Sequence, residues 1–190
     1  MSFWSKLFGT AKPEARTTTS SNPLRLSRPR IGFLNLLGAR GATLAEADRA
    51  LLAPLFAASV LTTDATLKCE VLFVYCAVDA KGRIHDSKLG VRELAEAAGA
   101  YVAVVATENP PRNYMALGPR GAWGANLVLV IDRKAEKFAL FFYRLFELMF
   151  KGESMLIAWV QLVPQVPGLE HPDAPGSIMA AEAGHITFDG

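Results

Sequence analysis

Two residues of this 190-residue sequence, Cys76 and His85, have the types that thiol chemistry requires. A histidine beside a cysteine lowers the pKa of the thiol and accepts its proton, which leaves a thiolate able to act as a nucleophile. Cys76 stands at the end of an apolar run, and His85 follows in the next polar segment. The pair is a candidate for catalysis. The alternative is a buried strand cysteine followed by a histidine on a surface loop.

Five further polar residues come after apolar runs that are typical of strands. In parallel α/β sheets, ligands gather beyond the carboxyl ends of the strands, where such residues meet. The candidates for contacts with a ligand are Arg40, Thr107, Glu108, Arg112 and Asp132. For Glu108 and Arg112, an ion pair within one loop is the alternative.

The segment Gly38–Gly41 links a predicted strand to a predicted helix and contains Arg40. Free backbone N–H groups at the start of a helix can hold an anion, and Arg40 would assist them. The segment has neither the dinucleotide-binding nor the P-loop pattern of glycines. A flexible turn with a solvated arginine is the alternative.

Three polar residues near the end of the sequence, His171, Asp173 and His185, contain the side-chain types that bind metals. Their spacing matches no standard zinc site. We therefore expect no metal and no cofactor.

The elements that must position these residues alternate between strands and helices. A capping box of Thr43 and Glu46 is expected to start a helix that Pro54 shortens, and Gly99 is a suitable terminator for another helix. The expected strands are 31–37, 71–78, 101–106, 125–131 and 155–163, the expected helices are 44–55, 89–98 and 134–151, and two short strands are expected within 177–188. Strands that are apolar on both faces are typical of parallel sheets between helix layers. We predict a three-layer, mainly parallel α/β fold of the Rossmann-like kind.

The predicted helix over 138–150 is apolar or aromatic at every position except Arg144 and Glu147. A surface helix is normally apolar along one stripe only. This helix is therefore either central in the core or part of an interface, and we favour the interface. Its candidate interface residues are Phe138, Phe141, Phe142, Leu145, Phe146 and Met149.

Charge divides the chain at about residue 30. The net charge of +2 is the balance of +5 on residues 1–30 and −3 on residues 31–190. We predict a basic, flexible tail over 1–30 and a single α/β domain over 31–190. Because the domain lacks a stripe of basic residues, nucleic acid is not an expected partner.

The beginning of the chain has the apolar residues Phe3, Trp4, Leu7 and Phe8 beside one lysine. Residues 3–8 are thus a candidate for weak peripheral contact with a membrane, and a loose chain end is the alternative. The sequence shows no secretory signal pattern and has only two cysteines, which are placed unfavourably for a disulfide. We expect a reduced, cytoplasmic protein of bacterial type.

Three segments carry a family resemblance: VLFVYCAVDAKGRI, YVAVVATENP and GANLVLVIDRKAEKFALFFYRLFELMFKGESMLIAW. Together they cover about residues 71–159, and in order and apolar pattern they resemble the caspase-like CHAT architecture. The resemblance implies a catalytic His-Gly motif after one strand and a catalytic cysteine after a later one. The chain departs from both, with Cys76 and Ala77 at the first place and Thr107 before Glu108 at the second. It thus resembles a caspase-like domain without its dyad.

These observations predict a non-enzymatic α/β interaction module that binds a protein partner or itself. The alternative is a small cysteine hydrolase, or a sensor of a small ligand, that uses the loops at the carboxyl ends of the strands.

Overall fold

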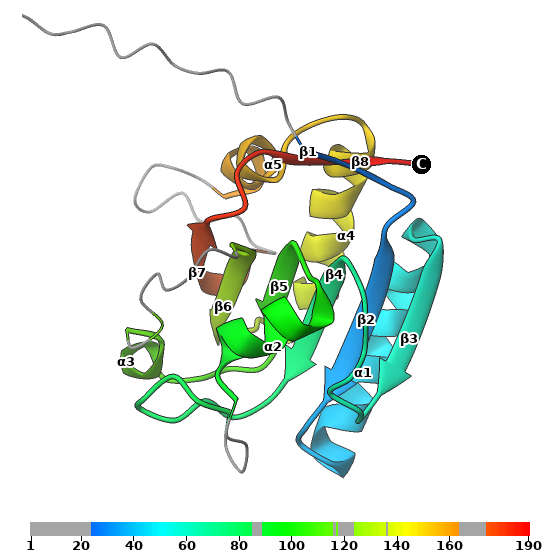
Figure 1. Ribbon diagram of the computed structural model, residues 1–190. Coiled ribbons are helices and arrows are strands. Elements are labelled where there is room, and N and C mark those ends of the chain that lie inside the picture. The colour runs from blue at the N-terminus through cyan, green and yellow to red at the C-terminus, as the bar shows by residue number, and fades with distance from the viewer. Residues whose placement is uncertain (1–23, 85–88, 116, 118–123, 136, 164–173) are drawn as a thin grey trace, which may run out of the picture.

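A computed structural model describes residues 24–84, 89–115, 117, 124–135, 137–163 and 174–190. Its centre is a six-stranded sheet with the order β3-β2-β4-β5-β6-β7 (Figure 1). The strands are β2 (Arg30–Asn35), β3 (Ala58–Thr62), β4 (Val71–Tyr75), β5 (Val102–Val105), β6 (Asn126–Asp132) and β7 (Gly176–Ala181). All neighbours pair in parallel except β6 and β7, which are antiparallel.

Helices cover both faces of the sheet, as the sequence predicted (Figure 1). On one face lie α1 (Ala39–Leu52), α4 (Lys137–Phe150), α5 (Met155–Leu162) and a small parallel sheet of β1 (Leu24–Ser27) and β8 (Ile186–Asp189). On the other face lie α2 (Val91–Ala98) and the short α3 (Pro111–Tyr114). A hydrophobic core lies on each face of the sheet, and successive strand residues point alternately into one core and the other. Phe73 packs toward α4, and Leu72 and Val74 pack toward α2. The three-layer α/β prediction is therefore confirmed.

The aromatic helix α4 lies inside the fold rather than at a surface. The side chains expected at an interface are all fully buried within this one chain: Phe138, Phe141, Phe142, Leu145, Phe146 and Met149. Phe142 packs edge-on against Phe73 of the sheet, and Phe141 packs against Trp159 of α5. On a third side, Phe146 meets Phe188 of β8. The helix is apolar nearly all round because the sheet, α5 and β8 surround it, and this packing replaces the expected interface.

One predicted strand is wrong: residues 155–162 form helix α5. Ser154 caps this helix by accepting a hydrogen bond from the N–H of Ile157 at 3.4 Å. A short apolar run does not distinguish a buried strand from a buried helix by periodicity. The cap at Ser154 was the sequence signal for a helix.

Three boundaries also differ from the sequence prediction. The folded part begins before Ile31, because Leu24–Ser27 form β1 beside β8. Helix α1 starts at Ala39, one turn before Thr43, so Thr43 is not its cap. It ends at Leu52, where a 3₁₀ turn that contains Pro54 follows (η2, Ala53–Leu55), as expected from the proline. Residues 1–23, with the candidate membrane contact at 3–8, lie outside the described residues.

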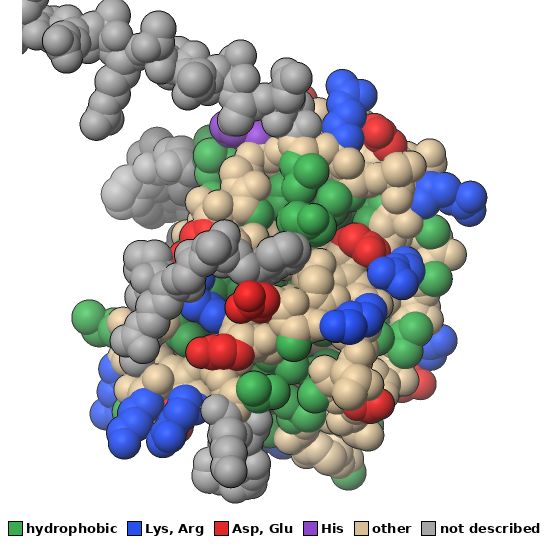
Figure 2. Space-filling model, in the orientation of Figure 1, with side chains coloured by type: hydrophobic (Ala, Val, Ile, Leu, Met, Phe, Trp, Pro, Cys, Tyr) green, Lys and Arg blue, Asp and Glu red, His purple; other side chains and the backbone are tan. Residues whose placement is uncertain are grey.

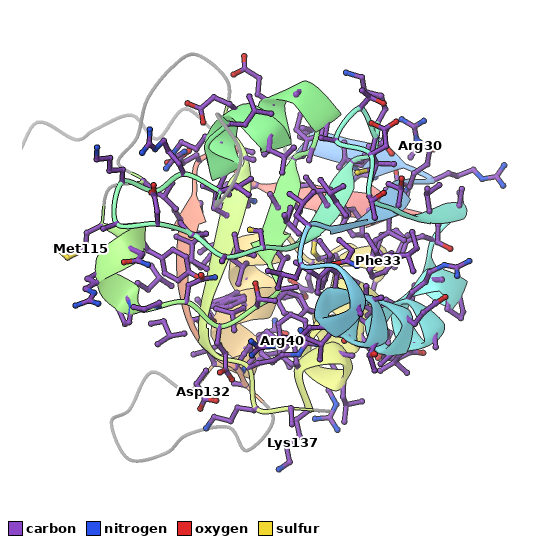
Figure 3. All side chains as sticks on the ribbon, turned by 90° about the horizontal axis from the view of Figure 1, so that it is seen from below. Arg30, Phe33, Arg40, Met115, Asp132 and Lys137 are labelled. Atoms are coloured by element: carbon purple, nitrogen blue, oxygen red, sulfur yellow. The ribbon has the colours of Figure 1, made fainter. Side chains whose placement is uncertain are left out.

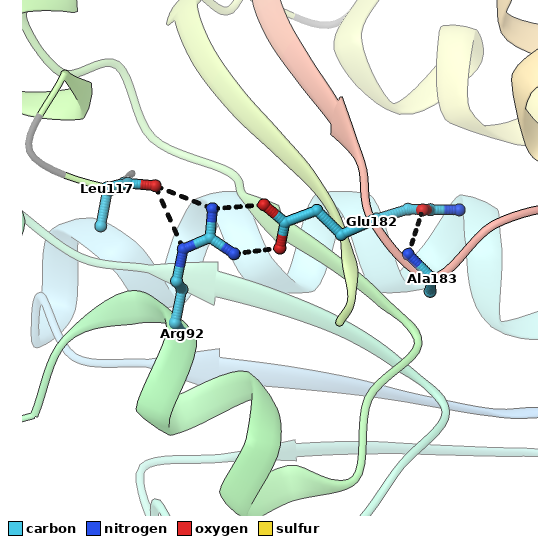
Figure 4. A network of polar contacts seen from close by, with 5 residues as sticks. Arg92, Leu117, Glu182 and Ala183 are labelled. Carbon is cyan, nitrogen blue, oxygen red and sulfur yellow. Dashed lines mark hydrogen bonds and ion pairs between the residues drawn. The ribbon is translucent and has the colours of Figure 1, made fainter. Parts of the chain in front are cut away.

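A polar clamp ties the outer elements together (Figure 4). The guanidinium of Arg92 on α2 forms a two-pronged ion pair with Glu182, which follows β7. It also donates to the carbonyl oxygen of Leu117 at 2.7 Å. Beside it, the side-chain oxygen of Asn126 accepts from the N–H of Ala183 at 3.1 Å. The clamp therefore joins α2 to the segment between β7 and β8.

Candidate functional site

A pocket of about 590 Å³ opens at the carboxyl edge of the sheet, between the ends of β2, β4, β5 and β6. Its walls come from residues after each of these strands: Leu37, Arg40, Thr43, Leu44, Cys76, Ala77, Thr107, Glu108, Asn109 and Arg133. The chain runs from β2 outward to β3 and then returns to the other side of β2 at β4, so the strand order reverses here. Ligands of open α/β sheets bind at such reversal points. The pocket has the place and size of a ligand site.

Arg40 is presented by the turn between β2 and α1. Asn35 holds this turn by donating to the carbonyl oxygen of Gly38 at 2.8 Å and accepting from the N–H of Leu37 at 3.0 Å. Gly38 has a φ of 62°, which favours glycine, and a Cβ on Gly41 would lie only 2.0 Å from the Asn35 side-chain oxygen. The two glycines therefore allow α1 to begin directly over Asn35, with Arg40 in its first turn.

Arg40 lies over the middle of the carboxyl edge, as Figure 3 shows from that side. Its side chain is exposed, and no hydrogen bond or ion pair joins it to another residue of the described chain. The first turn of α1 has no side-chain cap and no acidic residue. An uncapped helix start and a cation without a partner among the described residues thus border the same pocket.

Cys76 and Thr107, at the ends of the neighbouring strands β4 and β5, lie side by side. The hydroxyl of Thr107 donates to the carbonyl oxygen of Cys76 at 2.6 Å and accepts from its N–H at 3.2 Å. Cys76 is buried, and burial raises the pKa of its thiol to about 12. The thiol is therefore protonated at neutral pH. His85 lies outside the described residues, so the predicted pair with Cys76 has no geometry to report.

Asn109 fixes the floor of the pocket. Its side-chain oxygen accepts from the N–H of Val78 at 2.8 Å, and its amide nitrogen donates to the carbonyl oxygen of Thr107 at 3.1 Å. Both of its polar atoms are thereby used within the fold. Asn109 is not among the ligand contacts predicted from the sequence, which in this loop are the hydroxyl and charged residues Thr107, Glu108 and Arg112.

Beneath the pocket lies a buried polar triad of Tyr75, Asp48 and Arg133. The Tyr75 hydroxyl donates to one carboxylate oxygen of Asp48 at 2.6 Å, and the Arg133 guanidinium donates to the other at 2.5 Å. Arg133 also donates to the carbonyl oxygen of Ala106 at 2.5 Å and stacks on Phe138, 3.8 Å from the ring centre. Burial raises the pKa of Asp48, although its bonds to Arg133 and Tyr75 act in the opposite direction.

The sequence carried a signal for this triad that was missed. Asp48 lies between Leu44 and Leu52 at helical spacing, so it is an acidic residue on the apolar stripe of α1. A carboxylate at such a position needs a buried partner. Arg133, at the end of β6, is that partner.

The five predicted ligand contacts do not all converge. Arg40, Thr107 and Glu108 line the pocket, and one oxygen of Glu108 accepts from the backbone N–H of Arg133 at 3.0 Å. Arg112 is an exposed residue of α3 that does not line the pocket. Asp132 is exposed and accepts from the N–H of the nearby Lys134 at 3.1 Å.

Other kinds of site find no support in the part of the chain that the structure describes. No three metal-ligating side chains gather there, and none of the helices has the length and apolar character needed to cross a bilayer. His185 lies 3.3 Å from the hydroxyl of Ser154, whereas His171 and Asp173 fall outside the described residues.

The order of the parallel strands, counted from β2, is 2-1-3-4-5, which is one of the two common orders of doubly wound sheets. The pocket lies at the reversal point of this order. Neither a model of a known protein family, nor a characterised protein, nor a solved structure matches the chain.

Proposed function

We propose that this protein is a non-enzymatic binding module that holds a small polar ligand in the pocket at the carboxyl edge of its sheet. The observation that carries the proposal is the position of Arg40, which has no ion-pair partner among the described residues, beside the uncapped start of α1 on the wall of a pocket at the strand-order reversal. This arrangement is a wall suited to an anionic group. The triad beneath it holds α1, β4 and the end of β6 together, so the pocket is formed before a ligand arrives.

Binding is favoured over cysteine hydrolysis because of the state of the thiol. Burial raises the pKa of the Cys76 thiol to about 12, so the thiol keeps its proton at neutral pH. The backbone carbonyl oxygen and N–H of Cys76 are both hydrogen-bonded to the Thr107 hydroxyl. A nucleophilic cysteine needs a lowered pKa and an accessible sulfur. The same two positions are those where the caspase-like resemblance expects the catalytic dyad, which fits a degenerate member of that architecture. The two unpaired, buried cysteines suit the reducing cytoplasm in which we place the module.

The test is a screen of small polar fragments by NMR on the full chain. Ala77, an exposed residue of the pocket wall, is replaced by tryptophan to fill the pocket, and Ala50, exposed on α1 outside the pocket, is replaced likewise as the matched control. We expect fragments that shift the amide signals of Leu44 and Thr107 in the natural chain and in Ala50→Trp, but not in Ala77→Trp. A screen with no such fragments, or fragments that bind Ala77→Trp equally well, would overturn the proposal.

Self-association is a second candidate, favoured by α5. Leu156, Ile157 and Val160 are 38%, 47% and 47% exposed on one side of this helix. Elsewhere, on the face that carries α2, exposed apolar side chains form separate groups between acidic and basic ones (Figure 2). A second copy that packs on α5 would bury these three residues. Light scattering with size-exclusion chromatography tests this: a dimer that becomes a monomer in Ile157→Ser/Val160→Ser supports it, and a monomeric natural chain refutes it.

A further inference from the structure

We infer that the ligand of this pocket is a small zwitterion of the free amino acid class, with an apolar side chain. The inference rests on the proposed binding function and adds the chemical class of the ligand. It follows from two charges of opposite sign that line one pocket without pairing with each other.

The positive wall is formed by Arg40 and the amino end of α1. Arg40 has no ion-pair partner among the described residues, and the first turn of α1 lacks both a capping side chain and a carboxylate. An arginine fork and a helix start favour the same kind of group, a carboxylate or another small anion. The ligand therefore has an anionic end here.

The negative wall is formed by Glu108, at the end of β5. One of its oxygens accepts from the backbone N–H of Arg133, and the other has no partner among the described residues. The charge of Arg133 does not neutralise Glu108, because its guanidinium is bonded to Asp48 and to the carbonyl oxygen of Ala106. The free oxygen of Glu108 is thus an acceptor for a cationic amine on the ligand.

The rest of the pocket limits the class further. Leu37, Leu44 and Ala77 supply apolar wall, which suits a hydrocarbon side chain attached to the carbon that carries the two charged groups. A ligand with several negative charges, such as a nucleoside polyphosphate, would meet the carboxylate of Glu108 in the same pocket and be repelled. A compact ligand with one charge of each sign satisfies both walls.

The experiment uses three probes that share one side chain and differ in their charged groups: leucine, N-acetyl-leucine, which lacks the ammonium, and leucinamide, which lacks the carboxylate, with the same three forms of valine, methionine and phenylalanine. Calorimetric titration of the full chain measures each affinity. We expect at least one free amino acid to bind about tenfold or more tightly than its acetylated and amidated forms, since each of those forms lacks one charge-assisted contact.

Two substitutions then separate the walls. Arg40→Gln should weaken the free amino acid and leave its amidated form unchanged, because that form has no carboxylate. Glu108→Gln should weaken the free amino acid and leave its acetylated form unchanged, because that form has no amine. Arg112→Gln, which removes an exposed charge outside the pocket, is the control and should change none of the affinities.

The outcomes distinguish this inference from the function on which it rests. Equal binding of the three forms, displacement of the bound amino acid by inorganic phosphate or ATP, or binding by no free amino acid overturns the zwitterion inference. If fragments of other chemistry still bind the natural chain and not Ala77→Trp, the binding function stands. If no fragment enters the pocket, both fail.

Discussion

The hydroxyl of Tyr75 donates a hydrogen bond of 2.6 Å to the carboxylate of Asp48, and both side chains are almost wholly buried. Tyr75 ends β4, and Asp48 lies in the middle of α1. The second carboxylate oxygen of Asp48 accepts from Arg133, at the end of β6. Three elements that are distant in sequence are therefore joined at one carboxylate, directly below the candidate ligand pocket.

Asp48→Ala should be strongly destabilising. It leaves the Arg133 guanidinium buried without its counter-charge, and loss of one partner of a buried ion pair costs about 3–5 kcal/mol. Tyr75→Phe removes only one hydrogen bond and should cost about 1–2 kcal/mol. Urea unfolding followed by circular dichroism measures both variants. Equal and small losses in the two would mean that Arg133 finds another partner.

The thiol of Cys76 should react slowly in the folded protein. With its pKa raised to about 12 by burial, the thiolate is scarce at pH 8, whereas an unfolded cysteine ionises near pH 8.5. A chromogenic disulfide reagent at pH 8 should label both cysteines within seconds in urea and far more slowly in buffer. Rapid labelling of Cys76 in the folded chain would revive the hydrolase hypothesis.

The same buried thiols should make the fold less stable at alkaline pH. The pKa values of Cys69 and Cys76 are both raised to about 12 by burial. A thiol whose pKa is higher in the folded than in the unfolded state stabilises the folded protein. This stabilisation is complete below about pH 8.5 and is lost as the pH rises toward 12. The free energy of unfolding should therefore fall between about pH 8.5 and 11, and less steeply in Cys69→Ala/Cys76→Ala. An identical slope in that variant would assign the loss to other groups.

A glycine at position 135 should stabilise the protein. Lys134 and Ala135, which lead from β6 to α4, have φ values of 56° and 49°, in the left-handed region. That conformation costs a residue with a Cβ about 1 kcal/mol, and glycine adopts it freely. Ala135→Gly should raise the midpoint of thermal unfolding, whereas the same change at Ala47, an exposed residue inside α1, should lower it. A lower midpoint in both variants would show that the strain lies elsewhere.

The clamp between Arg92 and Glu182 should contribute more than an ordinary surface pair. Both side chains are mostly buried, and the pair is two-pronged, so Glu182→Ala should cost about 2 kcal/mol. The exposed pair of Glu147 and Lys151 on the end of α4 is the comparison, and Glu147→Ala should cost less than about 0.5 kcal/mol. Chemical denaturation of the two variants measures the difference. Similar losses would place the Arg92 pair among ordinary surface contacts.

Much of the fold was predictable because its parallel strands are buried on both faces. The run Val71–Tyr75 has no polar position, and such runs identify central strands directly. The edge strand β3 was missed because it has only five residues, all exposed or partly exposed, and shows no clear pattern of apolar positions. Helix α5 was mistaken for a strand for the opposite reason, since an eight-residue apolar run looks the same in either state.

The site was predictable only where its residues follow strands that the sequence reveals. The carboxyl-edge rule located Arg40, Thr107 and Glu108, because each follows a strand end. It also selected Asp132, whereas the next residue, Arg133, is the one that enters the pocket wall. The ion pair of Asp48 and Arg133 depends on how α1 crosses the sheet. That placement depends on the order of the strands in the sheet, which no local sequence pattern contains.

The position of β8 at the end of the chain affects how the protein folds during synthesis. Phe188 of β8 packs on Phe146 and Phe150 of α4 and on Phe56. Because the ribosome synthesises α4 before β8, Phe56, Phe146 and Phe150 lack their contacts with Phe188 until Phe188 leaves the exit tunnel. A nascent chain that stalls after α4 therefore exposes an aromatic, hydrophobic surface of the kind that chaperones bind.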